Sequence, residues 1–263
     1  MKSYVSLFRT RLASIFQYRA AALASLYTQI FFGFIRVMIF TTFYQSATGP
    51  MPMALQETIT YIWLAQILMR LIPWNVDTDL EDILVKGNVA YELVRPINLF
   101  MAWFSRILAL RLAPVVLTGS ILFPIALLFL GLDLPKSLFE ASTFCVSALG
   151  SLLVSASYTA LLTVLCFWSI STAGLTRFMA FFVHFFSGLV IPLPLFPDFM
   201  QGFLKYQPFA GLFDTPLRLY MGHIPSGESF QAIGLQFAWT ALFLITGHLL
   251  MKHIEKKVVI QGG

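Results

Sequence analysis

The 263-residue chain is 58% hydrophobic and 16% aromatic, and only 11% of its residues are charged. Soluble domains carry about 25% charged residues, so this composition excludes a globular protein that turns a polar surface to water on every side. The formal net charge of +5 comes from basic residues near the ends of apolar runs, as in a membrane protein rather than a nucleic-acid-binding protein. We therefore expect an integral membrane protein with lipid around it and no nucleic-acid partner.

The N-terminal segment, residues 1–22, is predicted to form a helix that lies in the inner membrane interface. Val5 and Leu12 belong to a set of apolar residues at near-helical spacing, and Arg9 and Arg11 lie between them. A frayed, solvated tail is the alternative interpretation. The recurring basic residues and the long apolar stretch that follows argue against a cleaved signal peptide.

Six apolar runs approach the length of about 20 residues that a helix needs to cross the hydrocarbon core. They are residues 23–44, 57–73, 101–130, 139–167, 178–196 and 231–251. The second run is marginal in length, and Pro114 and Pro124 predict a kink or a break in the third. The sequence thus predicts an all-α polytopic membrane protein with about six transmembrane helices, folded as a single domain over residues 1–263.

Orientation follows from the distribution of lysine and arginine, because inner loops carry an excess of both. With the N-terminus inside, thirteen basic residues fall on inner segments and three on outer segments, which predicts that both termini are cytoplasmic. The inner set is Lys2, Arg9, Arg11, Arg19, Arg70, Lys86, Arg95, Arg106, Arg111, Arg177, Lys252, Lys256 and Lys257. The outer set is Lys136, Lys205 and Arg218.

The inner connection over residues 74–98 holds five of the twelve acidic residues. Asp77, Thr78 or Asp79 can cap a helix that follows, and acidic residues in its first turn favour the helix dipole. Gly87 supplies a C-terminal stop. The loop is therefore predicted to contain a short acidic helix at the cytoplasmic surface.

Leu80, Ile83 and Leu84 fall at i, i+3 and i+4 and give this helix an apolar stripe. Apolar residues with a charged rim suit a helix that docks into a groove on a cytosolic partner. An ordinary polar connection is the alternative interpretation of the same residues.

The residues from Leu80 to Asn98, LEDILVKGNVAYELVRPIN, resemble the inner loop of permeases of the ABC-2 superfamily. The likeness is to a branch of six-helix permeases with the pattern G-x-[IV]-x-x-x-L-x-[RK]-P. Gly87, Val89, Leu93, Arg95 and Pro96 carry that pattern here.

The outer connection, residues 197–230, resembles the same branch from Tyr206 to Gly222, YQPFAGLFDTPLRLYMG. The resemblance implies short re-entrant helices that dip into the outer leaflet before the last span.

Such permeases form the membrane half of ATP-driven transporters. The resemblance therefore implies two cytosolic ATPase subunits and a second permease, the same or a related chain, as partners. A coupling helix between the second and third spans would contact the ATPase. It would comprise Leu80, Glu81, Asp82, Ile83, Leu84, Lys86 and Gly87.

The chain itself lacks the phosphate-binding pattern G-x-x-x-x-G-K-[ST], since no lysine follows a glycine. We therefore expect no enzymatic activity and no cofactor on this chain, with ATP and Mg²⁺ bound by the partner subunits.

A possible substrate path is formed by Arg36, Trp63 and Gln66, which are polar or amphipathic groups inside apolar runs. Arg36 could attract an anionic group of a substrate or pair across a subunit interface. Alternatively, it could snorkel or bond to Thr41 or Gln66.

Taken together, the sequence predicts a permease subunit that exports a hydrophobic or amphiphilic compound across a bacterial inner membrane. The alternatives are an intramembrane lipid-modifying enzyme and an ion-coupled secondary transporter. Both would need convergent acidic or other polar groups within the membrane, and the apolar runs contain almost no carboxylates.

Overall fold

The computed structural model describes residues 2–17, 19–73, 76–85, 92, 97–168 and 172–256, and these residues form helices and no strand. Among the described residues, four helices are long and apolar enough to cross a membrane. They are α2 (Arg19–Ser46), α6 (Leu99–Phe129), α7 (Leu138–Leu165) and α11 (Ser226–Glu255). The expected all-α polytopic fold is therefore confirmed.

Two shorter helices, α3 (Leu55–Leu68) and α8 (Thr172–Phe186), correspond to the second and fifth predicted spans. The short elements are α1 (Lys2–Gln17), α4 (Thr78–Val85), α9 (Asp198–Tyr206) and α10 (Asp214–Tyr220), with 3₁₀ turns at Met69–Leu71, Cys166–Trp168, Leu193–Leu195 and Pro208–Leu212.

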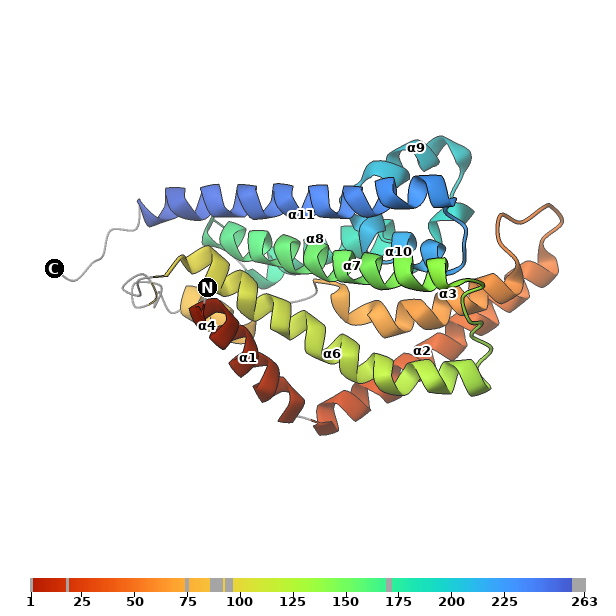
Figure 1. Cartoon of the computed structure of the whole chain (residues 1–263), viewed down its shortest axis with the longest axis horizontal. Coiled ribbons are helices and arrows are strands. Elements are labelled where there is room, and N and C mark those ends of the chain that lie inside the picture. Colours follow the sequence, from red (N-terminus) through yellow and green to blue (C-terminus); the bar gives the residue numbers. More distant parts are fainter. Residues whose placement is uncertain are drawn as a thin grey trace.

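The long helices run side by side, and the short elements gather at the two ends of the bundle (Figure 1). The start of α1, helix α4 and the last turn of α11 lie together at one end, which we call the α4 end. The connections from α2 to α3 and from α6 to α7 lie at the other end with α9 and α10, which we call the α10 end. Successive bundle helices therefore alternate in direction.

Helix α7 lies at the centre of the bundle, and small residues line its buried face. Gly150, Ser151 and Ala156 are examples that let α11 and the 3₁₀ turn Pro208–Leu212 approach closely. Gln236 on α11 is buried there, accepts a hydrogen bond from Ser147 Oγ at 3.0 Å and donates to the Gly211 carbonyl at 2.7 Å. Polar groups buried in this way need such partners, so the network fixes the register between α7 and α11.

Helix α3 is short because it is packed inside the bundle. Ten of its fourteen residues are buried, and it contacts α2, α6 and α10. An ideal helix of that length spans only about 21 Å, and the 3₁₀ turn Met69–Leu71 extends it toward the α4 end. At Gly33 of α2, an added Cβ would lie 2.4 Å from the indole of Trp63, so only glycine allows this close approach.

The fifth predicted span differs from the structure. It was expected over residues 178–196, but α8 covers Thr172–Phe186 and the chain turns at Gly188, which has a φ of 86°. For the third span the sequence predicted a kink or a break, and the structure excludes a break, since α6 runs from Leu99 to Phe129 through both prolines. Each proline removes one backbone hydrogen bond, and the rest of the helix provides enough bonds to continue.

Candidate functional site

Helix α4 begins at an aspartate cap. Asp77 Oδ1 accepts a hydrogen bond from the backbone N–H of Asp79 at 3.0 Å, and the Asp77 carbonyl accepts one from the N–H of Glu81 at 2.8 Å. This arrangement satisfies amide groups that the first turn of a helix leaves without partners. Of the three capping residues that the sequence allowed, the structure places Asp77 in that role.

The apolar stripe of α4 faces its own bundle. Leu80 is fully buried in a cluster that includes Phe100 and Trp103 of α6, and Ile83 packs against the same cluster. The Leu80 side chain thus packs within this chain and holds α4 on the end of the bundle. Whether the segment from Leu80 onward couples to an ATPase stays a prediction.

An ion cluster fastens α4 to two other helices. Arg11 of α1 contacts Asp77 at 2.7 Å and Asp79 at 3.0 Å, and Arg106 of α6 contacts Asp79 at 3.0 Å. The Asp77 side chain is completely buried, and both arginines are largely buried. Charge-assisted bonds of this kind are stronger than neutral ones, and removing one member leaves a buried charge without its counter-ion. The cluster thus joins α1, α4 and α6 mechanically.

The outer face of α4 is acidic. The side chain of Asp79 is 54% exposed, Asp82 is exposed, and Glu81 is half-buried. The side chain of Leu84 and the residues Lys86 and Gly87 lie outside the described part of the chain, as does most of the G-x-[IV]-x-x-x-L-x-[RK]-P pattern. The described surface of α4 therefore presents carboxylates rather than apolar side chains.

Arg111 of α6 supports the same end of the bundle from within. It is buried and donates hydrogen bonds to the Ile72 carbonyl at 3.0 Å and to Thr159 Oγ1 at 3.3 Å. Because the last carbonyls of a helix lack intrahelical partners, Arg111 stabilises the segment that leads from α3 into α4. Sequence reasoning counted this residue only as an inner positive charge.

Arg36 is half-buried and donates a hydrogen bond to the Leu189 carbonyl at 2.7 Å. This bond joins α2 to the turn after α8, and the acceptor differs from the two that the sequence suggested, Thr41 and Gln66. The structure therefore gives Arg36 a definite structural partner, and a role in substrate contact stays a prediction.

Trp63 and Gln66 are both buried within α3. The indole of Trp63 contacts the ring of Phe34 at 5.4 Å between centroids. The pocket described below is lined by none of Trp63, Gln66 and Arg36. Trp63 and Gln66 are thus packed inside the bundle, and a substrate path along these three residues stays a prediction.

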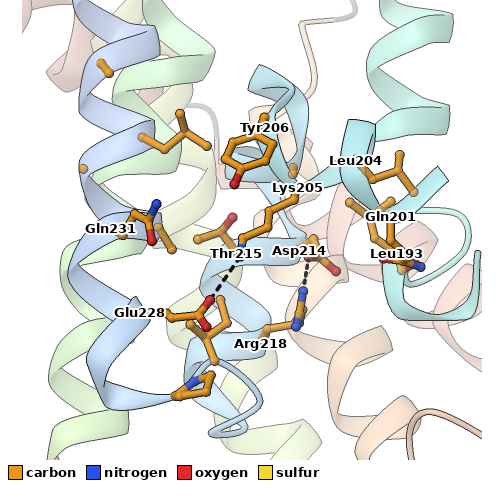
Figure 2. A pocket seen from close by; sticks show the side chains of 17 residues that line it. Leu193, Gln201, Leu204, Lys205, Tyr206, Asp214, Thr215, Arg218, Glu228 and Gln231 are labelled. Atoms are coloured by element: carbon orange, nitrogen blue, oxygen red, sulfur yellow. Dashed lines mark hydrogen bonds and ion pairs between the residues drawn. The ribbon is translucent and has the colours of Figure 1, made fainter. Parts of the chain in front are cut away.

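A pocket of about 460 Å³ lies at the α10 end, between α9, α10 and the first turns of α11. Four charged side chains face one another across it (Figure 2). Lys205 contacts Glu228 at 3.1 Å, and Arg218 contacts Asp214 at 3.5 Å. The sequence predicted short helices here, and they are confirmed, but it predicted no pocket because its walls come from three separate segments.

The fold therefore defines a multi-pass membrane protein with a tethered acidic helix at one end and a charged pocket at the other. The chain belongs to the ABC-2 family, because a family model described as ABC-2 family transporter protein matches residues 30–262. A comparison with curated proteins found no match. Proteins of this family are membrane components of transporters, so the chain is of the permease class, as its sequence predicted.

Proposed function

We propose that this chain is the permease subunit of an ATP-driven exporter of a hydrophobic or amphiphilic compound. Separate cytosolic ATPase subunits bind ATP and Mg²⁺, and a second permease, identical or related, completes the membrane part. Residues 1–263 act as one permease domain. Membership of the ABC-2 family supports this proposal at the level of class.

The single observation that carries the proposal is the position of α4. It connects α3 with the segment leading to α6, lies at the same end of the bundle as the start of α1 and the last turn of α11, and exposes carboxylates. A motor protein that moves the membrane helices needs a rigid element of this kind to push against. We assign contact with the ATPase to Glu81, Asp82 and the residues that follow them.

The distribution of basic residues supports a cytoplasmic location for the α4 end. Thirteen lysines and arginines belong to inner segments and three to outer segments, and this imbalance orients membrane proteins with the basic side in the cytoplasm. In this orientation both termini are cytoplasmic and α9 and α10 face outward. We propose a bacterial inner membrane as the location.

Force transmission follows from the ion cluster. When the ATPase subunits close, they displace α4, and Arg11 and Arg106 carry that displacement to α1 and α6 through their bonds to Asp79. Leu80 keeps α4 seated on the bundle during this movement. The membrane helices then tilt and open a path beside the second permease. Export is favoured by the apolar, aromatic character of the spans, which suits amphiphilic cargo.

The test is affinity purification of the full chain in mild detergent, followed by mass spectrometry, for the native sequence and for Glu81→Lys. We expect a P-loop ATPase to co-purify with the native chain. The charge reversal should reduce its recovery about tenfold, since a like charge across an interface costs more than 1.4 kcal/mol.

Asp198→Lys is the matched control, because Asp198 is an exposed acidic residue in the first turn of α9 at the opposite end. This variant should retain the ATPase. Equal recovery from both variants would remove the coupling role from α4, and failure of any ATPase to co-purify with the native chain would contradict the ATP-driven mechanism.

A further inference from the structure

The pocket at the α10 end is built from charges of both signs. Lys205 of α9 and Glu228 of α11 form one ion pair at its mouth, and Asp214 and Arg218 of α10 form a second one deeper inside. In Figure 2, Arg218 lies between Glu228 and Asp214, and Lys205 reaches toward Glu228 from the opposite wall. Two cations and two anions leave this site with no net formal charge.

The two ion pairs differ in how well they are satisfied. The Asp214 side chain is only 5% exposed, yet its contact with Arg218 is 3.5 Å long. The Nε of Arg218 is buried and has no hydrogen-bond acceptor in the described part of the chain. The Arg218 side chain is nevertheless 33% exposed and lines the pocket, so an anionic group of a ligand can accept charge-assisted hydrogen bonds from the exposed part of its guanidinium.

The remaining lining is apolar. Leu204 of α9 and Leu235 of α11 contribute aliphatic walls, and Ala232 of α11 leaves open space beside them. A volume of about 460 Å³ is typical of sites for small ligands or for the head and upper chain of a lipid. The pocket therefore combines polar groups of both signs with an apolar surface.

Tyrosine and tryptophan lie beside this pocket. Tyr206 of α9 lines it and is 55% exposed, and Trp239 of α11 donates a hydrogen bond to the Tyr206 carbonyl at 3.0 Å. Phe199 and Phe203 of α9 and Phe230 of α11 are 85%, 59% and 72% exposed, so the same two helices also present apolar rings. Tyrosine and tryptophan are enriched at membrane–water interfaces, so these residues favour a pocket at the depth of lipid head groups.

We propose that this pocket binds a zwitterionic phospholipid of the surrounding bilayer by its head group. The ammonium group pairs with Glu228 and the phosphate with Arg218 and Lys205, while the start of an acyl chain lies along Leu204 and Leu235. Each protein charge then keeps a counter-charge when the ligand enters. A lipid with a net negative head group would leave a charge uncompensated, which disfavours it. This inference is independent of the cargo and of the ATPase.

The experiment is native mass spectrometry of the full chain, released from detergent, during titration with dioleoylphosphatidylethanolamine or dioleoylphosphatidylglycerol. The two lipids share their acyl chains and differ in head-group charge. We expect the zwitterionic lipid to bind about tenfold more tightly, the effect of one charge-assisted bond. Glycerophosphoethanolamine, which keeps the zwitterionic phosphodiester head group without acyl chains, should not compete at equal concentration.

Two variants test the location of the site. Glu228→Gln keeps the shape of the side chain and removes its charge, and Ala232→Trp fills the open space; each should weaken binding of the zwitterionic lipid about tenfold. Lys136→Gln, an exposed charge outside this pocket at the same end, should leave binding unchanged.

The melting temperature of each variant without lipid is measured alongside, so a folding defect is recognised as such. Equal binding of the two lipids, equal competition by glycerophosphoethanolamine, or unchanged binding in both pocket variants would each overturn the proposal.

Discussion

Gly33 on α2 shows how one residue controls the packing of two helices. The indole of Trp63 fills the space in which a side chain at this position would lie, and the nearest indole carbon would be 2.4 Å from an added Cβ. Real Cβ atoms do not approach other atoms this closely, so a larger residue forces either α2 or the buried indole to move. Because Trp63 is 1% exposed, it has little room to do so.

Gly33→Ala should therefore destabilise the protein by about 1–3 kcal/mol, the usual cost of overpacking a core. The measurement is the melting temperature in detergent for Gly33→Ala, Trp63→Leu and the double variant. Because the smaller leucine relieves the clash, the double variant should lose less stability than the sum of the two single variants. Strict additivity would show that the two residues do not contact each other.

Residue patterns predicted part of the candidate site and missed the rest for a physical reason. The cap at Asp77 and the stripe at Leu80 follow from local spacing, and the structure contains both. The direction in which the stripe faces does not follow from spacing, since a helix on a membrane protein can bury an apolar face against its own bundle or against a partner. The pairing of Asp77 with Arg11 joins residues 66 positions apart and has no local signature.

Helix α4 is an element whose position depends on its ion cluster. Arg11 donates to both Asp77 and Asp79 from the neighbouring helix α1. Arg11→Gln removes the charge of this donor and leaves the buried Asp77 with weaker compensation, while Leu80 still holds α4 to the bundle. We expect local opening of α4 to become easier, because its stability relative to the rest of the fold is reduced.

Hydrogen–deuterium exchange of the purified chain measures this effect. The amides of residues 80–83 should exchange about tenfold faster in Arg11→Gln, corresponding to the loss of about 1.4 kcal/mol from a charge-assisted bond. Arg9→Gln provides the control, since Arg9 is exposed on the same helix. In this variant the amides of residues 80–83 should exchange at the rate of the native chain. Equal exchange in the two variants would mean that the cluster does not hold α4.

At the level of elements, long apolar periodic segments were predictable and their exact ends were less so. Four of the predicted spans, at 23–44, 101–130, 139–167 and 231–251, coincide with α2, α6, α7 and α11 to within a few residues. The predicted fifth span continues to residue 196, although α8 ends at Phe186. Residues 187–196 are apolar because they pack against other parts of the protein, and not because they extend the helix. Leu189 of this stretch is buried in the core of the bundle, and Leu193 is buried with Leu204 and Ala210, both outside any long helix.

For the whole molecule, the arrangement separates two surfaces at opposite ends of one bundle (Figure 1). The α4 end carries the acidic helix and its arginine supports, and the α10 end carries the charged pocket between short helices. Helix α7 joins the two, packing against both α10 and the turn Met69–Leu71 that precedes α4. A displacement at α4 therefore has a continuous packed route to the opposite end.

The most direct test of the central claim, that α4 contacts an ATPase, is site-specific photo-cross-linking in native membranes. A photoreactive amino acid is placed at Glu81 of α4 or at Phe199 of α9, which is exposed at the other end. We predict that a P-loop ATPase is cross-linked from position 81 and not from position 199. Cross-linking to an ATPase from position 199 alone, or from neither position, would contradict the account.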